Sequence, residues 1–144
     1  VRALEVVEFL PPVIEWHAGN LLPLDPPLSL DTRCTIRHGD FFALAASDEG
    51  FGAPQDAILI DIDHTPDWLL DQRSGSFYSE DGLAQLARHL KPGGVMGLWS
   101  DARTDEAFVA RMKSVFAEAW SEPVTFHNPL QNKPFTQTVY LARK

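Results

Sequence analysis

The sequence predicts an α/β fold in which helices cover a mostly parallel β-sheet. Apolar, β-branched runs alternate along the chain with segments that carry apolar residues at helical spacing. The chain has 144 residues, of which 44% are hydrophobic, and this size fits one domain that spans residues 1–144. The last two strand-like runs, 124–127 and 136–142, are close enough in sequence to form an antiparallel hairpin.

Strands are expected at 1–9, 33–37, 57–62 and 95–99. The run at 57–62 is almost continuously apolar, so we expect it to be the central strand. The first run is strand-like from Val1 onward, without the few polar residues that usually precede a first core element. This predicts a domain that is incomplete at its N-terminus.

Helices are expected after three start signals. Pro11 and Pro12 suit a first helical turn, and that helix should end near 19–20. Ser79 is the expected N-cap of a second helix, which stops at the Lys-Pro-Gly-Gly run of 91–94. Thr104 is the expected cap of a third helix, with a buried stripe that runs as far as Ala119. The proline-rich stretch 21–31 is predicted to be an ordered surface loop.

Composition excludes several classes of function. The formal net charge of -8 disfavours binding to the phosphates of nucleic acids and suits a cationic or neutral small molecule. Cys34 is alone, so an intrachain disulfide or a zinc site built on paired thiols is impossible, and the histidines lack metal-ligand spacing. No run approaches the roughly 20 apolar residues that span a bilayer, so we expect a cytoplasmic protein with no membrane contact.

Acidic residues stand at three predicted strand ends, where ligands of doubly wound sheets collect. Glu8 closes the first strand, Asp40 follows the second, and Asp61 and Asp63 follow the third, with His64 next to them. A carboxylate at such a strand end can accept both hydroxyls of a ribose, which is the role expected of Glu8. Asp40 could accept from an exocyclic amine such as that of adenine.

The other acidic residues suit the reacting end of a substrate. Asp61 and Asp63 could face a positively charged or amine-bearing molecule. His64 could act as a general base, because histidine titrates close to physiological pH. A structural reading of each residue remains open, since aspartate is common where strands turn into loops and a lone histidine is often only a polar loop residue.

Two common catalytic motifs are missing. The sequence 50–52 is a G-x-G, but it precedes a strand rather than following one, so it is expected to be a loop and not a phosphate cradle. No G-x-S-x-G elbow supports a hydrolase.

Six segments together resemble the spermidine synthase (polyamine aminopropyltransferase) family, within the class I S-adenosylmethionine-dependent methyltransferase fold. The segments are Glu5-Val-Val-Glu8, Pro12-Val-Ile-Glu15, His38-Gly39-Asp40, Asp56-Ala-Ile-Leu-Ile-Asp61, Phe77-Tyr78 and Leu90-Lys-Pro-Gly-Gly94. The resemblance covers nearly the whole chain. It implies a Rossmann-like sheet that lacks the family's first strand and glycine-rich loop, which would lie before Val1.

The resemblance also implies a cofactor and site residues. The co-substrate would be S-adenosylmethionine or decarboxylated S-adenosylmethionine, held by Glu8 at the ribose, by Asp40 at the adenine and by Asp61. Asp61, Asp63 and His64 would be the catalytic residues. In aminopropyltransferases an Asp-x-x-Asp arrangement follows this strand, and here histidine occupies its second acidic position, with Asp63 one residue away.

Three functional hypotheses follow. The first is an aminopropyl or methyl transferase that acts on a small, amine-bearing acceptor, with Glu8, Asp40 and Asp61 around one cleft. The second is a methyltransferase for another small molecule. The third is a non-catalytic module whose exposed sheet edge favours a homodimer.

Overall fold

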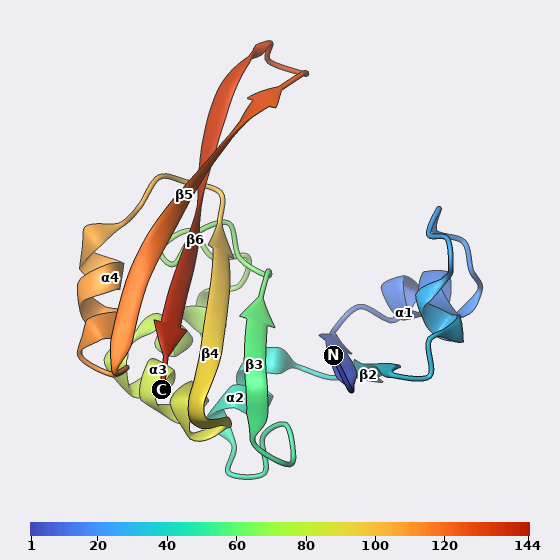
Figure 1. Ribbon diagram of the computed structural model, residues 1–144, viewed down its shortest axis with the longest axis horizontal. Helices are drawn as coiled ribbons and strands as arrows, with labels where there is room; N and C mark the ends of the chain where they lie inside the picture. The colour runs from blue at the N-terminus through green and yellow to red at the C-terminus, as the bar shows by residue number, and fades with distance from the viewer. The chain divides into compact units, whose positions relative to one another are not determined.

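Two parallel strands joined through a helix form the first part of the structure, a computed structural model that describes all 144 residues (Figure 1). Strand β1 (Leu4–Glu8) pairs with β2 (Cys34–His38) in parallel. Helix α1 (Pro11–Ala18) begins at the two prolines and ends at Gly19, as the sequence predicts. The proline-rich loop contains a short 3-10 helix, η1 (Leu28–Leu30).

The chain divides into two units, Val1–Leu44 and Ala45–Lys144. The second unit contains a four-stranded sheet in the order β3-β4-β6-β5. Strand β3 (Gln55–Ile60) is parallel to β4 (Leu90–Ser100), and β6 (Lys133–Arg143) is antiparallel both to β4 and to β5 (Glu118–Asn128). The α/β class, the parallel pairs and the C-terminal antiparallel hairpin are therefore confirmed.

Helices α3 (Glu80–Arg88) and α4 (Glu106–Lys113) pack on one face of this sheet, and η2 (Gln72–Tyr78) leads into α3. Helix α2 (Phe41–Ala46) contains the boundary between the two units. The Phe108 ring on α4 meets the Tyr140 ring on β6 edge to face, with centroids 5.0 Å apart, and neither side chain is exposed. The core is completed by apolar side chains from α3, β4 and α4: Leu83, Leu86, Met96 and Met112.

Three sequence expectations are corrected. Strand β3 lies at an edge of the four-stranded sheet, and not at its centre, because only β4 pairs with it. The third helix ends at Lys113, and Ala119 belongs to β5, where its side chain faces the core in strand rather than helix geometry. Asp105, and not Thr104, caps α4: its carboxylate accepts from the Ala107 N–H at 2.8 Å.

Ser79 caps α3, as predicted, by accepting from the N–H of Gly82 at 3.1 Å. No helix in the structure has the length and apolar character needed to span a bilayer.

The contact at the start of α3 predicts that alanine at position 82 is less stable than glycine, which is the reverse of their usual order in helices. A β-carbon at Gly82 would collide with the main-chain oxygens of Ser76 and Phe77. We expect Gly82→Ala to lower the free energy of unfolding by about 1–3 kcal/mol, although alanine is the better helix former. Denaturant unfolding followed by circular dichroism measures this.

Ala84 in the same helix is exposed and supplies the control. Ala84→Gly should lose about 1 kcal/mol through helix propensity alone. A Gly82→Ala protein that is more stable than the starting chain would contradict the packing at η2 and α3.

Candidate functional site

Glu8 and Asp40 lie at the same end of the β1–β2 pair. The N–H of Gly39 donates to the main-chain oxygen of Glu8 at 3.0 Å, so the carboxyl ends of the two strands are adjacent. This is the arrangement that the sequence predicts for two neighbouring parallel strands.

Each of these two carboxylates uses one oxygen to orient the local backbone. Oε1 of Glu8 accepts from the N–H of Leu10 at 2.7 Å. Oδ1 of Asp40 accepts from the N–H groups of Phe42 and Ala43, at 2.9 and 3.2 Å, at the start of α2. The structural reading is thus correct for one oxygen of each residue. Oε2 of Glu8 and Oδ2 of Asp40 make no hydrogen bond within the chain and could accept from a ligand.

Asp61, Asp63 and His64 lie in the second unit, in the loop that follows β3. Asp61 comes directly after Ile60 of the strand and is exposed. Asp63 is 4% exposed, so two residues of the same short loop have opposite environments. Only Asp61 presents a solvated carboxylate at the strand end.

Asp63 is held by three donors. Oδ1 accepts from the N–H of Leu70 at 2.7 Å, and Oδ2 accepts from the Tyr78 hydroxyl at 2.8 Å and the Ser74 hydroxyl at 3.3 Å. Hydrogen bonds from these positions compensate the desolvation of the carboxylate and tie the start of the loop to η2. Burial, together with the hydrogen bond to Asp63, raises the pKa of Tyr78 far above its ordinary value, so its hydroxyl remains a donor.

His64 is half-buried, and its ring packs against Trp68 with centroids 4.7 Å apart. Its main-chain oxygen accepts from the N–H of Asp101, which follows β4, at 2.6 Å. The loops after β3 and β4 are joined by this bond. The ring nitrogens of His64 have no hydrogen-bond partner in the chain and are available to a ligand.

A pocket of about 330 Å³ lies among the same loops and the starts of α3 and α4. Its charged residues are Asp67, Glu80, Asp105 and Arg111. Nη1 of Arg111 donates to the main-chain oxygen of Tyr78 at 2.7 Å, and its guanidinium lies 5.7 Å from the centre of the Phe108 ring. Three carboxylates against one guanidinium make the pocket acidic.

Sequence reasoning did not find this pocket. Asp105 is the N-cap of α4 and also lines the pocket, and the sequence indicated neither role. Asp67, Glu80 and Arg111 are brought together only because η2, α3 and α4 pack on one face of the sheet. Glu80 at the start of α3 and Asp105 at the start of α4 are the two positions that could have indicated a shared edge.

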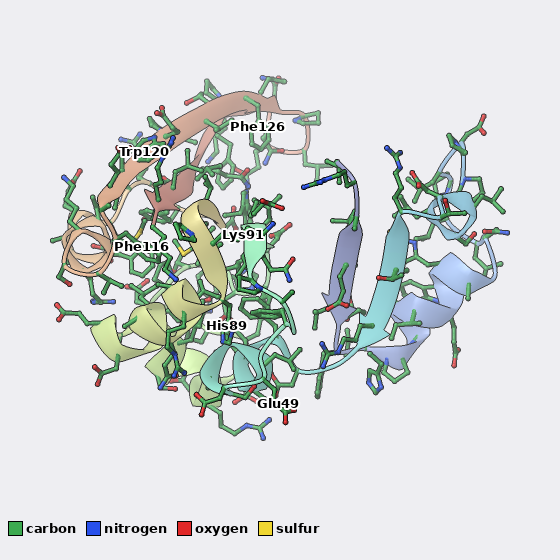
Figure 2. The ribbon with its side chains drawn as sticks, turned by 60° about the horizontal axis from the view of Figure 1, so that its bottom comes forward. Glu49, His89, Lys91, Phe116, Trp120 and Phe126 are labelled. Atoms are coloured by element: carbon green, nitrogen blue, oxygen red, sulfur yellow. The ribbon has the colours of Figure 1, made fainter.

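A smaller pocket, of about 190 Å³, lies near the opposite end of β3. It is lined by Asp48, Arg88 and His89, and the first two form an ion pair at 2.9 Å. His89, labelled in Figure 2, directs Nε2 to the main-chain oxygen of Ala45 at 3.1 Å. This pocket is away from the strand ends at which ligands of such sheets bind.

Solved structures that match this chain share a class I methyltransferase-like fold. A spermidine synthase from Thermotoga maritima matches all of the chain with a TM-score of 0.66 and 16% identity. A spermidine synthase in complex with the transition state analogue AdoDATO also matches all of it, with a TM-score of 0.70 and 18% identity. Human methyltransferase-like protein 13 in complex with SAH matches 96% of the chain, with a TM-score of 0.64 and 19% identity.

These likenesses establish the fold that the sequence predicts, the Rossmann-like sheet of the S-adenosylmethionine-dependent methyltransferases. The chain spans 45% and 47% of the two spermidine synthases and 60% of the human protein. No protein-family model and no curated protein matches the sequence. The site roles of Glu8, Asp40, Asp61, Asp63 and His64 stay predictions.

Both tyrosines of the chain should resist ionisation. Burial raises the pKa of Tyr78 and of Tyr140, the latter also surrounded by acidic residues. The folded protein therefore keeps protons that the unfolded chain releases near pH 10. The resulting stability is complete below about pH 10 and is lost as the pH rises above it.

The measurement is an alkaline titration of phenolate absorbance, with and without denaturant. We expect no phenolate in the native protein at about pH 10, and two phenolates after unfolding at the same pH. Tyr78→Phe and Tyr140→Phe assign the signals. A native ionisation step near pH 10, with circular dichroism unchanged, would contradict the burial of these hydroxyls.

Proposed function

We propose that this chain forms part of a transferase that uses S-adenosylmethionine or its decarboxylated form. The group transferred is aminopropyl or methyl, and the acceptor is a small molecule that bears an amine. The observation that carries this proposal is the match of the whole chain to spermidine synthases and to a methyltransferase, one solved with AdoDATO and another with SAH.

The adjacent carboxylates at the ends of β1 and β2 support a nucleoside site. Oε2 of Glu8 would accept the ribose hydroxyls, and Oδ2 of Asp40 would accept the exocyclic amine of adenine. Their other oxygens already bond the backbone, which holds both side chains in place before a ligand binds. Asp61 would provide a further contact to the cofactor or the acceptor.

The acidic pocket supports an amine as the acceptor. Asp67, Glu80 and Asp105 would stabilise a protonated amine at the far end of such a molecule. Arg111 donates to the main-chain oxygen of Tyr78 and lies against the Phe108 ring, and it forms no ion pair with the three carboxylates.

The chemistry requires alignment and removal of one proton. The lone pair of the neutral amine attacks the carbon attached to the sulfonium, the carbon–sulfur bond breaks, and its electrons leave with a neutral thioether. The new ammonium then loses a proton to a base, for which His64 has free ring nitrogens. Asp63, also predicted to be catalytic, has both oxygens engaged, which favours a positioning role for it.

Methyl transfer is the second candidate. The human methyltransferase-like protein matches this chain almost as well as the spermidine synthases do, with a TM-score of 0.64. The two candidates differ in the co-substrate: S-adenosylmethionine donates methyl, and its decarboxylated form donates aminopropyl.

Cofactor binding tests the nucleoside site. Calorimetric titration with S-adenosylmethionine, its decarboxylated form and S-adenosylhomocysteine should show binding in the micromolar range. Glu8→Gln and Asp40→Asn should each weaken it by about 10- to 150-fold, because each removes a charged acceptor that contributes roughly 1.5–3 kcal/mol.

Glu5→Gln is the matched control. Glu5 lies on the same strand, is exposed, and faces Arg37 at 3.5 Å, away from the strand end. If none of the three ligands binds at millimolar concentration, the transferase proposal is rejected and a non-catalytic module is favoured.

Turnover tests the base. With an amine acceptor and the co-substrate that binds, His64→Ala should lower kcat by about 100-fold or more. His127→Ala, a histidine exposed on β5, should leave kcat unchanged. If kcat is the same in the His64 variant, His64 does not take the proton.

A further inference from the structure

The main chain of His64 is held at the end of β4. Its oxygen accepts from the N–H of Asp101 at 2.6 Å and from the hydroxyl of Ser100, which is 1% exposed, at 3.5 Å. The ring of His64 packs on Trp68, which belongs to the same loop. Asp63 ties the preceding position to Tyr78 of η2. The residues at the end of β4 are therefore the part of the sheet that holds His64 itself.

Side chains of β6 hold the residues that follow β4. Backbone pairing between these two strands ends at Ser100 and Thr138 (Figure 1). Beyond that pair, Nε2 of Gln137 donates to Oδ1 of Asp101 at 3.1 Å. The Thr138 hydroxyl, which is not exposed, donates to the main-chain oxygen of Ala102 at 2.8 Å. Side chains thus continue the connection between β6 and the loop after β4 where the backbone ladder stops.

The amide of Gln137 makes two hydrogen bonds of opposite kinds. Its Oε1 accepts from the indole N–H of Trp99 at 3.2 Å, and its Nε2 donates to the carboxylate of Asp101. An indole only donates and an ionised carboxylate only accepts, so the two partners fix the orientation of the amide. A carboxylate at position 137 would lack the donor, and a lysine would lack the acceptor. Glutamine is therefore suited to hold Asp101 in one position.

We propose that Gln137 is a positioning residue for His64. Through Asp101 it holds the main chain of His64, and with it the ring that takes the proton from the new ammonium. This inference rests on the proposed function, in which His64 is the base. Proton transfer requires the base within hydrogen-bond reach, and a displacement of about 1 Å can cost roughly 100-fold in rate. Gln137 acts through Asp101 alone, so its effect falls on kcat and not on binding of the co-substrate.

Turnover and calorimetric titration test this role together. Gln137→Met removes both hydrogen bonds at similar side-chain length. It should lower kcat about tenfold, because the base is less well placed, and leave the Kd of the co-substrate unchanged. Gln131→Met is the matched control, since it is the same substitution at an exposed position in the turn of the same hairpin. It should change neither value.

Variants of Asp101 separate the hydrogen bond from a general effect on the fold. Asp101→Ala removes the acceptor and should lower kcat as much as Gln137→Met does. Asp101→Asn keeps an oxygen that accepts from Nε2 of Gln137 and should restore kcat. The double variant Gln137→Met/Asp101→Ala should be no slower than either single variant, because both changes remove the same bond.

Amide hydrogen exchange measures the link without turnover. The N–H at position 101 donates to the His64 oxygen, so its exchange should become at least about tenfold faster in Gln137→Met and in Asp101→Ala. The N–H of Leu98, inside the paired part of β4, should keep its rate. If Gln137→Met loses its circular dichroism signal, Asp101→Ala supplies the measurement. Equal acceleration at position 101 and at Leu98 would show a general loss of stability and overturn the positioning role.

Failure of this inference can be distinguished from failure of the proposed function. If His64→Ala leaves kcat unchanged, His64 is not the base, and the positioning role is rejected with it. If His64→Ala lowers kcat but Gln137→Met and Asp101→Ala retain it, the positioning role alone is overturned.

Discussion

The buried carboxylate of Asp63 holds together the end of the second unit at which the candidate acceptor pocket lies. It accepts from Tyr78, whose ring packs on Phe108, and the Phe108 ring in turn packs on Tyr140. The Tyr140 hydroxyl accepts from the N–H of Asp105 at 2.7 Å, at the start of α4. One chain of contacts therefore joins the loop after β3 to the loop after β4. Leaving one of its buried donors unpaired would cost about 1–3 kcal/mol.

The acidic pocket depends on this series of contacts. Tyr78 and Asp105 take part in the contacts and also line the pocket, and Arg111 donates to the main-chain oxygen of Tyr78. Asp105 stays in place because its N–H donates to the buried hydroxyl of Tyr140. Burial raises the pKa of the Tyr78 hydroxyl, so this hydrogen bond donor persists at physiological pH.

Local signals in the sequence predicted the elements well and the neighbours of each element less well. The N-cap at Ser79 and the prolines of α1 act within one helical turn, so they were correct. The run that forms β3 was expected at the centre because it is apolar on both sides, yet its second face and outer edge are exposed, as Leu59 shows. The spacing of Ala119 fits the apolar stripe of a longer α4 as well as it fits the strand β5. Packing against the sheet places it in the strand.

The sequence by itself determined which residues stand at the strand ends, because alternation of apolar runs and turn residues is a property of neighbouring positions. Glu8, Asp40 and Asp61 could be chosen for that reason. Only the tertiary structure decided that Asp63 is buried and Asp61 exposed, since the donors that surround Asp63 come from residues as far along the chain as Tyr78. The acidic pocket likewise exists only after η2, α3 and α4 pack together, because its charged residues come from positions far apart in the sequence.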